Sequence, residues 1–149
     1  GRRDMYVQMA KDFFRSVDYL ETRPDVDRDR LAYFSASVGD HFRPIPVSLD
    51  ARMKTAVFSL GGLRYNYPAG VQPANFMPRV KVPVLLVDGR DDFSAPEPAQ
   101  KRFIDLIGTS PEDKRHRMLD GGHIPNDWFG LSREVLDWLE KYQPGPVGS

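Results

Sequence analysis

Short apolar runs that end at turn residues are the feature that most constrains the fold of this chain. Strands are expected at residues 31–36, 55–60, 82–87 and 115–119. The first three runs are almost unbroken in their apolar character, which is typical of strands covered on both faces of a parallel sheet. Between residues 4 and 22, apolar side chains instead recur every three or four positions, as one face of an amphipathic helix requires. Further helices are expected at residues 97–106 and 132–142.

Helices that alternate with buried strands predict an α/β fold, because parallel strands must be joined by crossover connections. We expect a parallel sheet of about four strands flanked by helices. A chain of 149 residues suits one compact domain, which would span residues 1–149. The Pro-, Gly- and Asn-rich stretch at residues 64–78 is expected to be a loop with at most a helical turn, and residues 143–149 a flexible tail.

The balance of charge and the absence of cysteine argue against several classes of function. The 21 basic and 21 acidic residues cancel and are scattered along the chain, so neither nucleic acid nor a membrane surface is an expected partner. No apolar run approaches the roughly 20 residues that span a bilayer. Without cysteine there is no disulfide or thiolate metal site, which fits a cytoplasmic location, and no metal or cofactor is expected.

Polar residues with catalytic potential follow three of the predicted strands. Ser37 lies in Ser-Ala-Ser-Val-Gly after the first strand, Asp91 and Asp92 follow the third, and His123 follows the fourth. The carboxyl ends of parallel strands meet at one edge of a sheet, where ligands bind in such folds. A serine hydroxyl becomes nucleophilic when a base takes its proton, and a carboxylate orients that base. The order serine, aspartate, histidine is that of α/β-hydrolases.

Three stretches resemble the C-terminal half of bacterial α/β-hydrolase esterases related to dienelactone hydrolase and prolyl oligopeptidase: DFFRSVDYLETRPDVDRDRLAYFSASVGD, VPVLLVDGRDDFSAP and DKRHRMLDGGHIP. They occur in the order of the family, and the resemblance covers nearly the whole chain. It implies a truncated α/β-hydrolase fold. It also implies a serine esterase that hydrolyses small-molecule carboxylic esters through an acyl-serine intermediate.

The resemblance further implies a role for each candidate residue. Ser37 would be the nucleophile and His123 the base, and the backbone N–H of Val38 would help to bind the oxyanion. The Gly-Arg-x-Asp-Phe pattern of the family falls on residues 89–93. This match favours Asp92 as the acid and leaves Asp91 as the alternative.

The turn at the candidate nucleophile departs from the family pattern in three places. Ser35 stands where the first glycine of Gly-x-Ser-x-Gly is expected, and a serine is small enough for the turn. Asp40 follows the second glycine, where the family usually has a small residue. Pro44 and Pro46 fall within the helix that should follow, and proline in a helix interior costs about 3 kcal/mol. We therefore expect this helix to be short, kinked or displaced.

The largest departure concerns the N-terminal strands of the family's fold. The sequence before Ser37 predicts one helix and contains no His-Gly segment of the kind that supplies a second oxyanion N–H group. For the same reason, the strand at residues 31–36 is expected to be an open sheet edge. Open apolar edges tend to pair, so we expect a homodimer through this edge, in which the second chain supplies the missing donor.

Two other functions fit the same residues. The chain could be a non-catalytic fragment or pseudo-hydrolase that acts through self-association, or an α/β domain that binds a small ligand at its strand ends. Individual residues also have non-catalytic interpretations. His41 is expected to be structural or exposed, and His116 to lie on a basic surface. Trp128 and Phe129 either line an acyl pocket or pack, and Phe34 is expected in the core.

Overall fold

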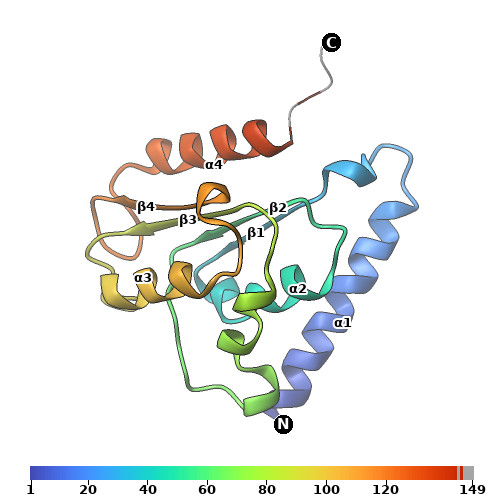
Figure 1. Ribbon diagram of the computed structural model, residues 1–149, viewed down its shortest axis with the longest axis horizontal. Helices are drawn as coiled ribbons and strands as arrows, with labels where there is room; N and C mark the ends of the chain where they lie inside the picture. The colour runs from blue at the N-terminus through green and yellow to red at the C-terminus, as the bar shows by residue number, and fades with distance from the viewer. Residues whose placement is uncertain (144, 146–149) are drawn as a thin grey trace.

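A parallel sheet divides the molecule into two helical layers (Figure 1). The structure, a computed structural model, describes residues 1–143 and Gly145, apart from the side chains of residues 40 and 41. Its strands lie side by side in chain order, and every neighbouring pair is parallel. They are β1 (Ala32–Ala36), β2 (Thr55–Ser59), β3 (Val84–Gly89) and β4 (Lys114–Leu119). The expected parallel sheet of four strands flanked by helices is therefore confirmed.

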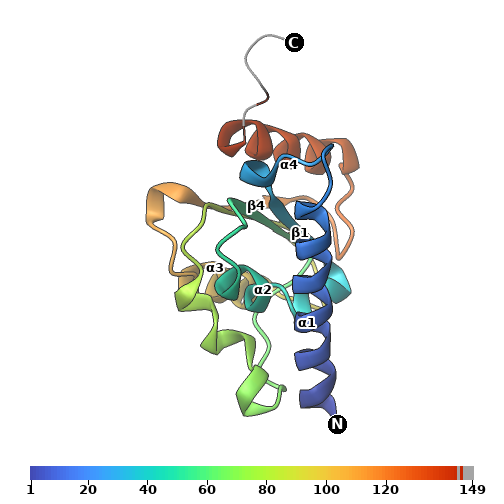
Figure 2. The same cartoon turned by 90° about the vertical axis from the view of Figure 1, so that its right-hand side faces the viewer.

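One helix covers one face of the sheet, and three helices lie on the other face. The first is α4 (Trp128–Tyr142), and the others are α1 (Arg2–Glu21), α2 (Pro44–Leu49) and α3 (Glu97–Leu106). Figure 2 shows the same layers from the side of α1. Among the described residues, no helix is both long and apolar enough to cross a membrane.

Helix α4 begins four residues before the predicted start at residue 132. The reason is a side-chain cap: the Asp127 carboxylate accepts a hydrogen bond from the Gly130 N–H at 2.7 Å. Aspartate is a favoured N-cap because it satisfies an N–H group that has no partner inside the helix. Gly130 therefore lies in the first turn of α4 instead of breaking it.

Two apolar layers hold the helices to the sheet, one on each face. Alternate residues of β2 point to opposite faces, so that Phe58 packs with Phe103 of α3 while Val57 packs with Trp138 of α4. Strands β2 and β3 are buried along their whole length. Trp138 also donates a hydrogen bond from Nε1 to Thr55 Oγ1 at 2.9 Å, which satisfies the one polar atom of its ring.

The edge strand β1 is covered on one face only. Tyr33 and Ser35 are buried, whereas Ala32 and Phe34 are exposed, and 56% of the Phe34 surface is accessible. The prediction that Phe34 lies in the core is therefore wrong. The physical reason is that α4 packs over β2 and β3 and leaves this face of β1 open.

The opposite edge, β4, is protected by charge. Arg115 and Arg117 are exposed and pair with Glu134 of α4 at 3.3 and 3.0 Å. Charged side chains on an edge strand oppose pairing with another sheet. Of the two edges of the described sheet, β1 is thus the open and apolar one.

Two prolines shorten the helix after Ser37, as expected. A 3₁₀ helix over Ser37–His41 is followed by the six-residue helix α2, which begins at Pro44. The N–H groups of a first helical turn have no acceptor inside the helix, so Pro44 and Pro46 are tolerated there. The Asp50 N–H still bonds to the Pro46 C=O at 2.9 Å.

The segment at residues 64–78 contains more structure than the single helical turn that was expected. It holds or overlaps three 3₁₀ helices: Ala69–Val71, Pro73–Asn75 and Met77–Arg79. Val71 and Met77 are buried and pack in the apolar layers below α1 and α2. These turns are held by packing against residues that are distant in the sequence, so no local sequence pattern predicts them.

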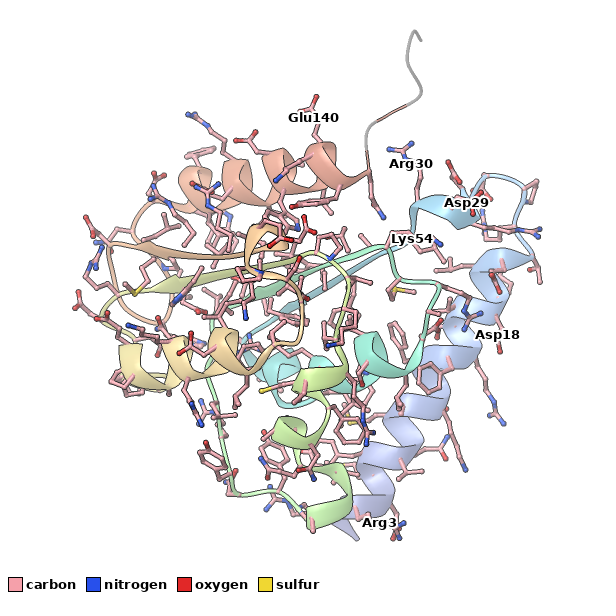
Figure 3. The ribbon with its side chains drawn as sticks, viewed as in Figure 1. Arg3, Asp18, Asp29, Arg30, Lys54 and Glu140 are labelled. Carbon is pink, nitrogen blue, oxygen red and sulfur yellow. The ribbon has the colours of Figure 1, made fainter. Side chains whose placement is uncertain are left out.

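The end of α4 is tied to the segment that leads into β1. Arg30 Nη2 donates to the C=O of Gln143 at 2.7 Å, and Figure 3 shows Arg30 extending toward the end of α4. The tail predicted at residues 143–149 lies largely outside the described residues. The prediction for the His41 side chain also lies outside them.

Charged side chains tie the end of α1 to the turn between α2 and β2. Arg52 contacts carboxylates of Asp18, Glu21 and Asp50 at 2.7, 2.8 and 2.7 Å. Asp50 is buried, and the hydrogen bonds from Arg52 hold the pKa of its carboxyl below the usual value. This cluster fixes α1 against the layer that supports the Ser37 turn.

Replacing Arg52 by methionine should lower the free energy of unfolding by about 2 to 3 kcal/mol at neutral pH, because Asp50 loses its charged donor. The Asp50 pKa is lower in the folded than in the unfolded chain. The stabilisation is therefore present above about pH 4 and is lost as the pH falls through the folded pKa. Urea unfolding at several pH values measures the difference.

Arg23→Met is a suitable control, since it breaks an exposed pair with Asp25. This variant should unfold like the wild type. A destabilisation by Arg52→Met that stays constant into acid would contradict the assigned role of Asp50.

Candidate active site

Ser37 stands at the sharp turn that ends β1. Its φ of +51° lies in the left-handed region, which residues other than glycine rarely adopt, and a 3₁₀ helix begins at the same residue. A strand, a strained turn and a helix thus follow one another, as the Gly-x-Ser-x-Gly pattern requires. Strain of this kind persists where the surrounding structure fixes it, and it concentrates at functional sites.

The space around this turn explains which residues it accepts. A Cβ atom on Gly39 would lie 3.2 Å from the Cβ of Ser35, which is tighter than ordinary contact. Glycine at position 39 therefore leaves room for a small side chain at position 35. Ser35 is buried, and its hydroxyl makes no hydrogen bond within the described part of the chain. The serine in place of the first glycine is compatible with the turn.

Three of the predicted site residues are connected by hydrogen bonds. Ser37 Oγ lies 2.7 Å from His123 Nε2, and His123 Nδ1 lies 2.8 Å from Asp92 Oδ2. The three residues come from the ends of β1, β4 and β3, respectively. The arrangement joins a hydroxyl, an imidazole and a carboxylate in the order in which they cooperate in acyl transfer.

A main-chain hydrogen bond also joins the segments that follow β3 and β4. The Arg90 N–H bonds to the Leu119 C=O at 2.8 Å. A Cβ atom on Gly89 would overlap the Gly122 carbonyl oxygen, so only glycine permits this close approach. The glycines around the two loops therefore bring Asp92 and His123 within hydrogen-bonding distance.

Asp92 is almost fully buried, with 1% of its surface exposed. Its Oδ1 accepts hydrogen bonds from the Ser94 N–H, the Ser94 hydroxyl and the Ala95 N–H at 2.8, 2.7 and 3.2 Å. Burial is the largest single influence and raises the pKa of the carboxyl. The hydrogen bonds from His123 and Ser94 together outweigh it and leave this pKa below its usual value. Asp92 is thus held as a carboxylate beside the imidazole.

The alternative acid, Asp91, is exposed, and the carboxylate bonded to His123 is that of Asp92. Ser94 completes the network, although the sequence places it only in a loop. Its Oγ lies 2.7 Å from Asp92 Oδ1 and 3.1 Å from His123 Nδ1. One sequence signal could have pointed to Ser94. An aspartate side chain often accepts a hydrogen bond from the N–H of the second residue after it, in an Asx turn, and Ser94 is the second residue after Asp92.

A small cavity opens at Ser37. It has a volume of about 240 Å³ and is lined by Ser37, Val38, Leu60, Arg64, Phe93, Ser94 and His123. The side chains of Val38 and Phe93 are 79% and 88% exposed and stand at its rim. Leu60 has a φ of +62°, so the main chain also turns sharply where β2 ends. The cavity suits a small ligand.

An apolar groove of about 360 Å³ lies beside this cavity, between β1 and α4. Phe34, Trp128 and Leu136 line it, and Leu60 lines both the groove and the cavity. Trp128 therefore faces the groove and not the cavity at Ser37. Phe129 lines neither space and is 84% exposed.

Val38, the expected oxyanion donor, follows Ser37 in the 3₁₀ helix. An N–H group in the first turn of a helix has no acceptor inside that helix, so the Val38 N–H remains available as a donor. The described residues before Ser37 form α1, the 3₁₀ turn Arg28–Arg30 and β1. In the esterase family that the sequence resembles, an earlier loop carries the second oxyanion N–H group. The described residues before Ser37 include no counterpart of that loop.

His116 does not lie on an exposed basic surface, contrary to the sequence-based expectation. Its Nε2 is 3.3 Å from Oδ2 of Asp88, which is fully buried. The other oxygen of Asp88, Oδ1, accepts a hydrogen bond from the Gly61 N–H at 2.8 Å, so this carboxylate lies between the turn after β2 and strand β4. Across the described part of the chain, no group of three or more histidine and acidic side chains is placed to hold a metal ion.

Comparison with known proteins bears on the fold. No family model and no curated protein match the sequence. A cold-adapted esterase from an Arctic intertidal metagenomic library superposes on 88% of this chain with a TM-score of 0.73 and 20% identity. The acetyl xylan esterase from Paenibacillus sp. R4 superposes on 92% with a TM-score of 0.75 and 19% identity. A structure of the metagenome-derived lipolytic enzymes LipS and LipT covers 91% with a TM-score of 0.73 and 17% identity.

This chain spans only part of those proteins. It covers 56% of the cold-adapted esterase, 53% of the acetyl xylan esterase and 74% of the lipolytic enzyme. All three have folds of the α/β-hydrolase type. The chain therefore contains part of an α/β-hydrolase fold, and at this level of identity the likeness extends to the fold alone.

Replacing Asp92 by asparagine should lower the free energy of unfolding by about 1 to 3 kcal/mol at neutral pH, because an amide cannot accept every hydrogen bond that the carboxylate receives. The lowered folded pKa means that this stabilisation is present above about pH 4 and disappears as the pH falls through the folded value. Urea unfolding from neutral pH into acid measures the effect. Asp91→Asn should resemble the wild type, and a gap between Asp92→Asn and wild type that widens in acid would refute this role.

Proposed function

We propose that this protein hydrolyses small carboxylic esters through a covalent acyl-Ser37 intermediate. The observation that carries the proposal is the hydrogen-bonded series Ser37, His123 and Asp92, with contacts of 2.7 and 2.8 Å. The strained turn at Ser37 and the fold shared with esterases and lipolytic enzymes support the same chemistry.

In the first half of the proposed reaction, Ser37 Oγ attacks the ester carbonyl carbon while His123 Nε2 takes the hydroxyl proton. The Asp92 carboxylate holds the Nδ1–H of His123 and stabilises the imidazolium that forms. The C–O bond to the alcohol then breaks, and His123 returns the proton to the departing alcohol. An acyl ester of Ser37 remains.

In the second half, water attacks the acyl carbon and His123 takes one of its protons. The bond between the acyl carbon and Ser37 Oγ breaks, the proton passes back to Ser37, and the carboxylic acid departs. Ser94 supports both halves, because its hydroxyl donates to Asp92 and fixes the carboxylate. No cofactor takes part in these steps.

We further propose that the protein works as a homodimer through the open edge of β1. The Leu31 C=O accepts a hydrogen bond from the Lys54 N–H on the side of β2. Because successive residues of a strand alternate, Ala32 and Phe34 turn their main-chain groups toward the open edge. A second copy that paired along this edge would satisfy those groups and cover the exposed Phe34.

The dimer would also complete the proposed site. Two N–H donors bind the oxyanion in this type of fold, and the loss of one costs roughly 100- to 1000-fold in turnover. Val38 provides one donor. Since Ser37 directly follows β1, a strand paired at this edge brings main-chain N–H groups of the second copy close to Ser37. A single domain over residues 1–149 and a cytoplasmic location stay predictions.

Ser37→Ala and His123→Ala should each lower the kcat for p-nitrophenyl acetate by roughly 1000-fold or more, because each removes a member of a unit that acts together. Steady-state kinetics measure this loss, and circular dichroism checks that each variant folds. Ser110→Ala alters an exposed hydroxyl far along the chain and should keep the wild-type rate. If Ser37→Ala and His123→Ala both kept the wild-type rate, the proposed reaction would be wrong. An inert, monomeric wild type would instead identify a non-catalytic fragment.

Phe34→Lys should convert the dimer to a monomer, because it places a charge in the apolar strand edge. Size-exclusion chromatography with light scattering at micromolar concentration measures the mass. Tyr65→Lys makes the same change at another aromatic side chain, 68% exposed, and should leave the dimer intact. A wild type that is a stable monomer under these conditions contradicts the proposed dimer.

A further inference from the structure

Arg64 stands in the cavity at Ser37 and is the one side chain with a permanent charge among the residues that line it. It lies in the segment that follows β2, close to the loop that carries Asp92. The Gln72 side-chain amide donates to the Arg64 C=O at 2.8 Å and helps to fix this segment. Arg64 takes no part in the proposed reaction steps, and no motif in the sequence singles it out.

The Arg64 guanidinium is only partly satisfied by the protein. Its Nη2 donates to the Ser94 C=O at 2.8 Å, and its Nε is buried without an acceptor among the described residues. No carboxylate of the described residues pairs with it, whereas Arg52 contacts three carboxylates. The Nε atom is enclosed by the protein, whereas Nη1 is not enclosed and has no acceptor among the described residues, so an anionic ligand in the cavity would gain charge-assisted hydrogen bonds there.

The chemistry around the Arg64 guanidinium favours a ligand that carries a carboxylate. A guanidinium is planar and presents parallel N–H donors that match the two oxygens of a carboxylate. Serine, histidine and apolar side chains form the rest of the cavity wall. The carboxylate of Asp92 is already engaged by His123 and Ser94, so it does not neutralise Arg64.

We propose that Arg64 is a specificity-determining residue that binds a carboxylate carried by the substrate. This inference rests on the proposed ester hydrolysis and names its substrate class: esters of small molecules that bear a free carboxylate, such as monoesters of short dicarboxylic acids. The cavity volume of about 240 Å³ leaves room for a short chain of a few carbons between the two groups. Arg64 holds the anionic end while Ser37 attacks the ester.

Binding of glutarate tests the carboxylate site without any turnover. In a titration of the full chain followed by ¹⁵N NMR, glutarate should shift the resonances of the Arg64 Nε–H and the Phe93 N–H, whereas neutral glutaramide should not. Arg64→Met should weaken glutarate binding roughly 10-fold or more. Arg90→Met alters an exposed arginine that pairs with Asp120 and does not line this cavity, so it should bind like the wild type.

Kinetics with matched esters test the selectivity. The wild type should have a higher kcat/KM for mono-p-nitrophenyl glutarate than for p-nitrophenyl valerate, which has the same number of acyl carbons and no charge. Arg64→Met should reduce this preference roughly 10- to 100-fold, mainly through KM. Arg64→Lys should keep part of the preference, because the charge remains while the planar fork is lost.

Two results would overturn the proposal. One is glutarate binding that equals glutaramide binding or survives Arg64→Met. The other is an equal fall in kcat/KM for both esters, which would assign Arg64 only to holding Ser94. If neither ester is hydrolysed, the proposed ester hydrolysis fails, and the glutarate titration still decides whether Arg64 binds a carboxylate.

Discussion

Burying a carboxylate is unfavourable unless hydrogen-bond donors surround it. The candidate site depends on the donors that surround the buried carboxylate of Asp92. Two donors come from Ser94 and one from Ala95, within the same loop. The remaining partner, His123, comes from the loop after the next strand. The bond to Asp92 therefore holds two loops together and directs Nε2 of the imidazole toward Ser37.

The parallel sheet makes this meeting possible. Because β1 to β4 lie in chain order and run in one direction, their carboxyl ends share one edge. Strands β3 and β4 are neighbours, so the loop that carries Asp92 touches the loop that carries His123. Ser37 follows β1, which β2 separates from β3, and its hydroxyl meets His123 beyond the end of β2. The same topology leaves β1 at the end of the sheet. The candidate nucleophile thus follows a strand whose outer side is open.

Much of the fold could be predicted because β2 and β3 are buried on both faces, where an apolar run is unambiguous. The run that contains Phe34 looks the same in the sequence, but its exposure depends on which helix lies over β1. Helix α4 starts early because the Asp127 cap tolerates a glycine in the first turn. At the site, chain order predicts Ser37, His123 and one of Asp91 and Asp92, and the family resemblance favours Asp92. Arg64 and the contact of Ser94 with His123 escape prediction, because they arise only when separate loops come together.

Covalent labelling shows whether Ser37 is a nucleophile that His123 activates. The wild type would be treated with a fluorophosphonate probe and the modified peptide identified by mass spectrometry. A single adduct should form on Ser37, and it should form far more slowly in His123→Ala. An unlabelled protein, an adduct on another serine such as Ser94, or labelling that does not depend on His123 would contradict this role of Ser37.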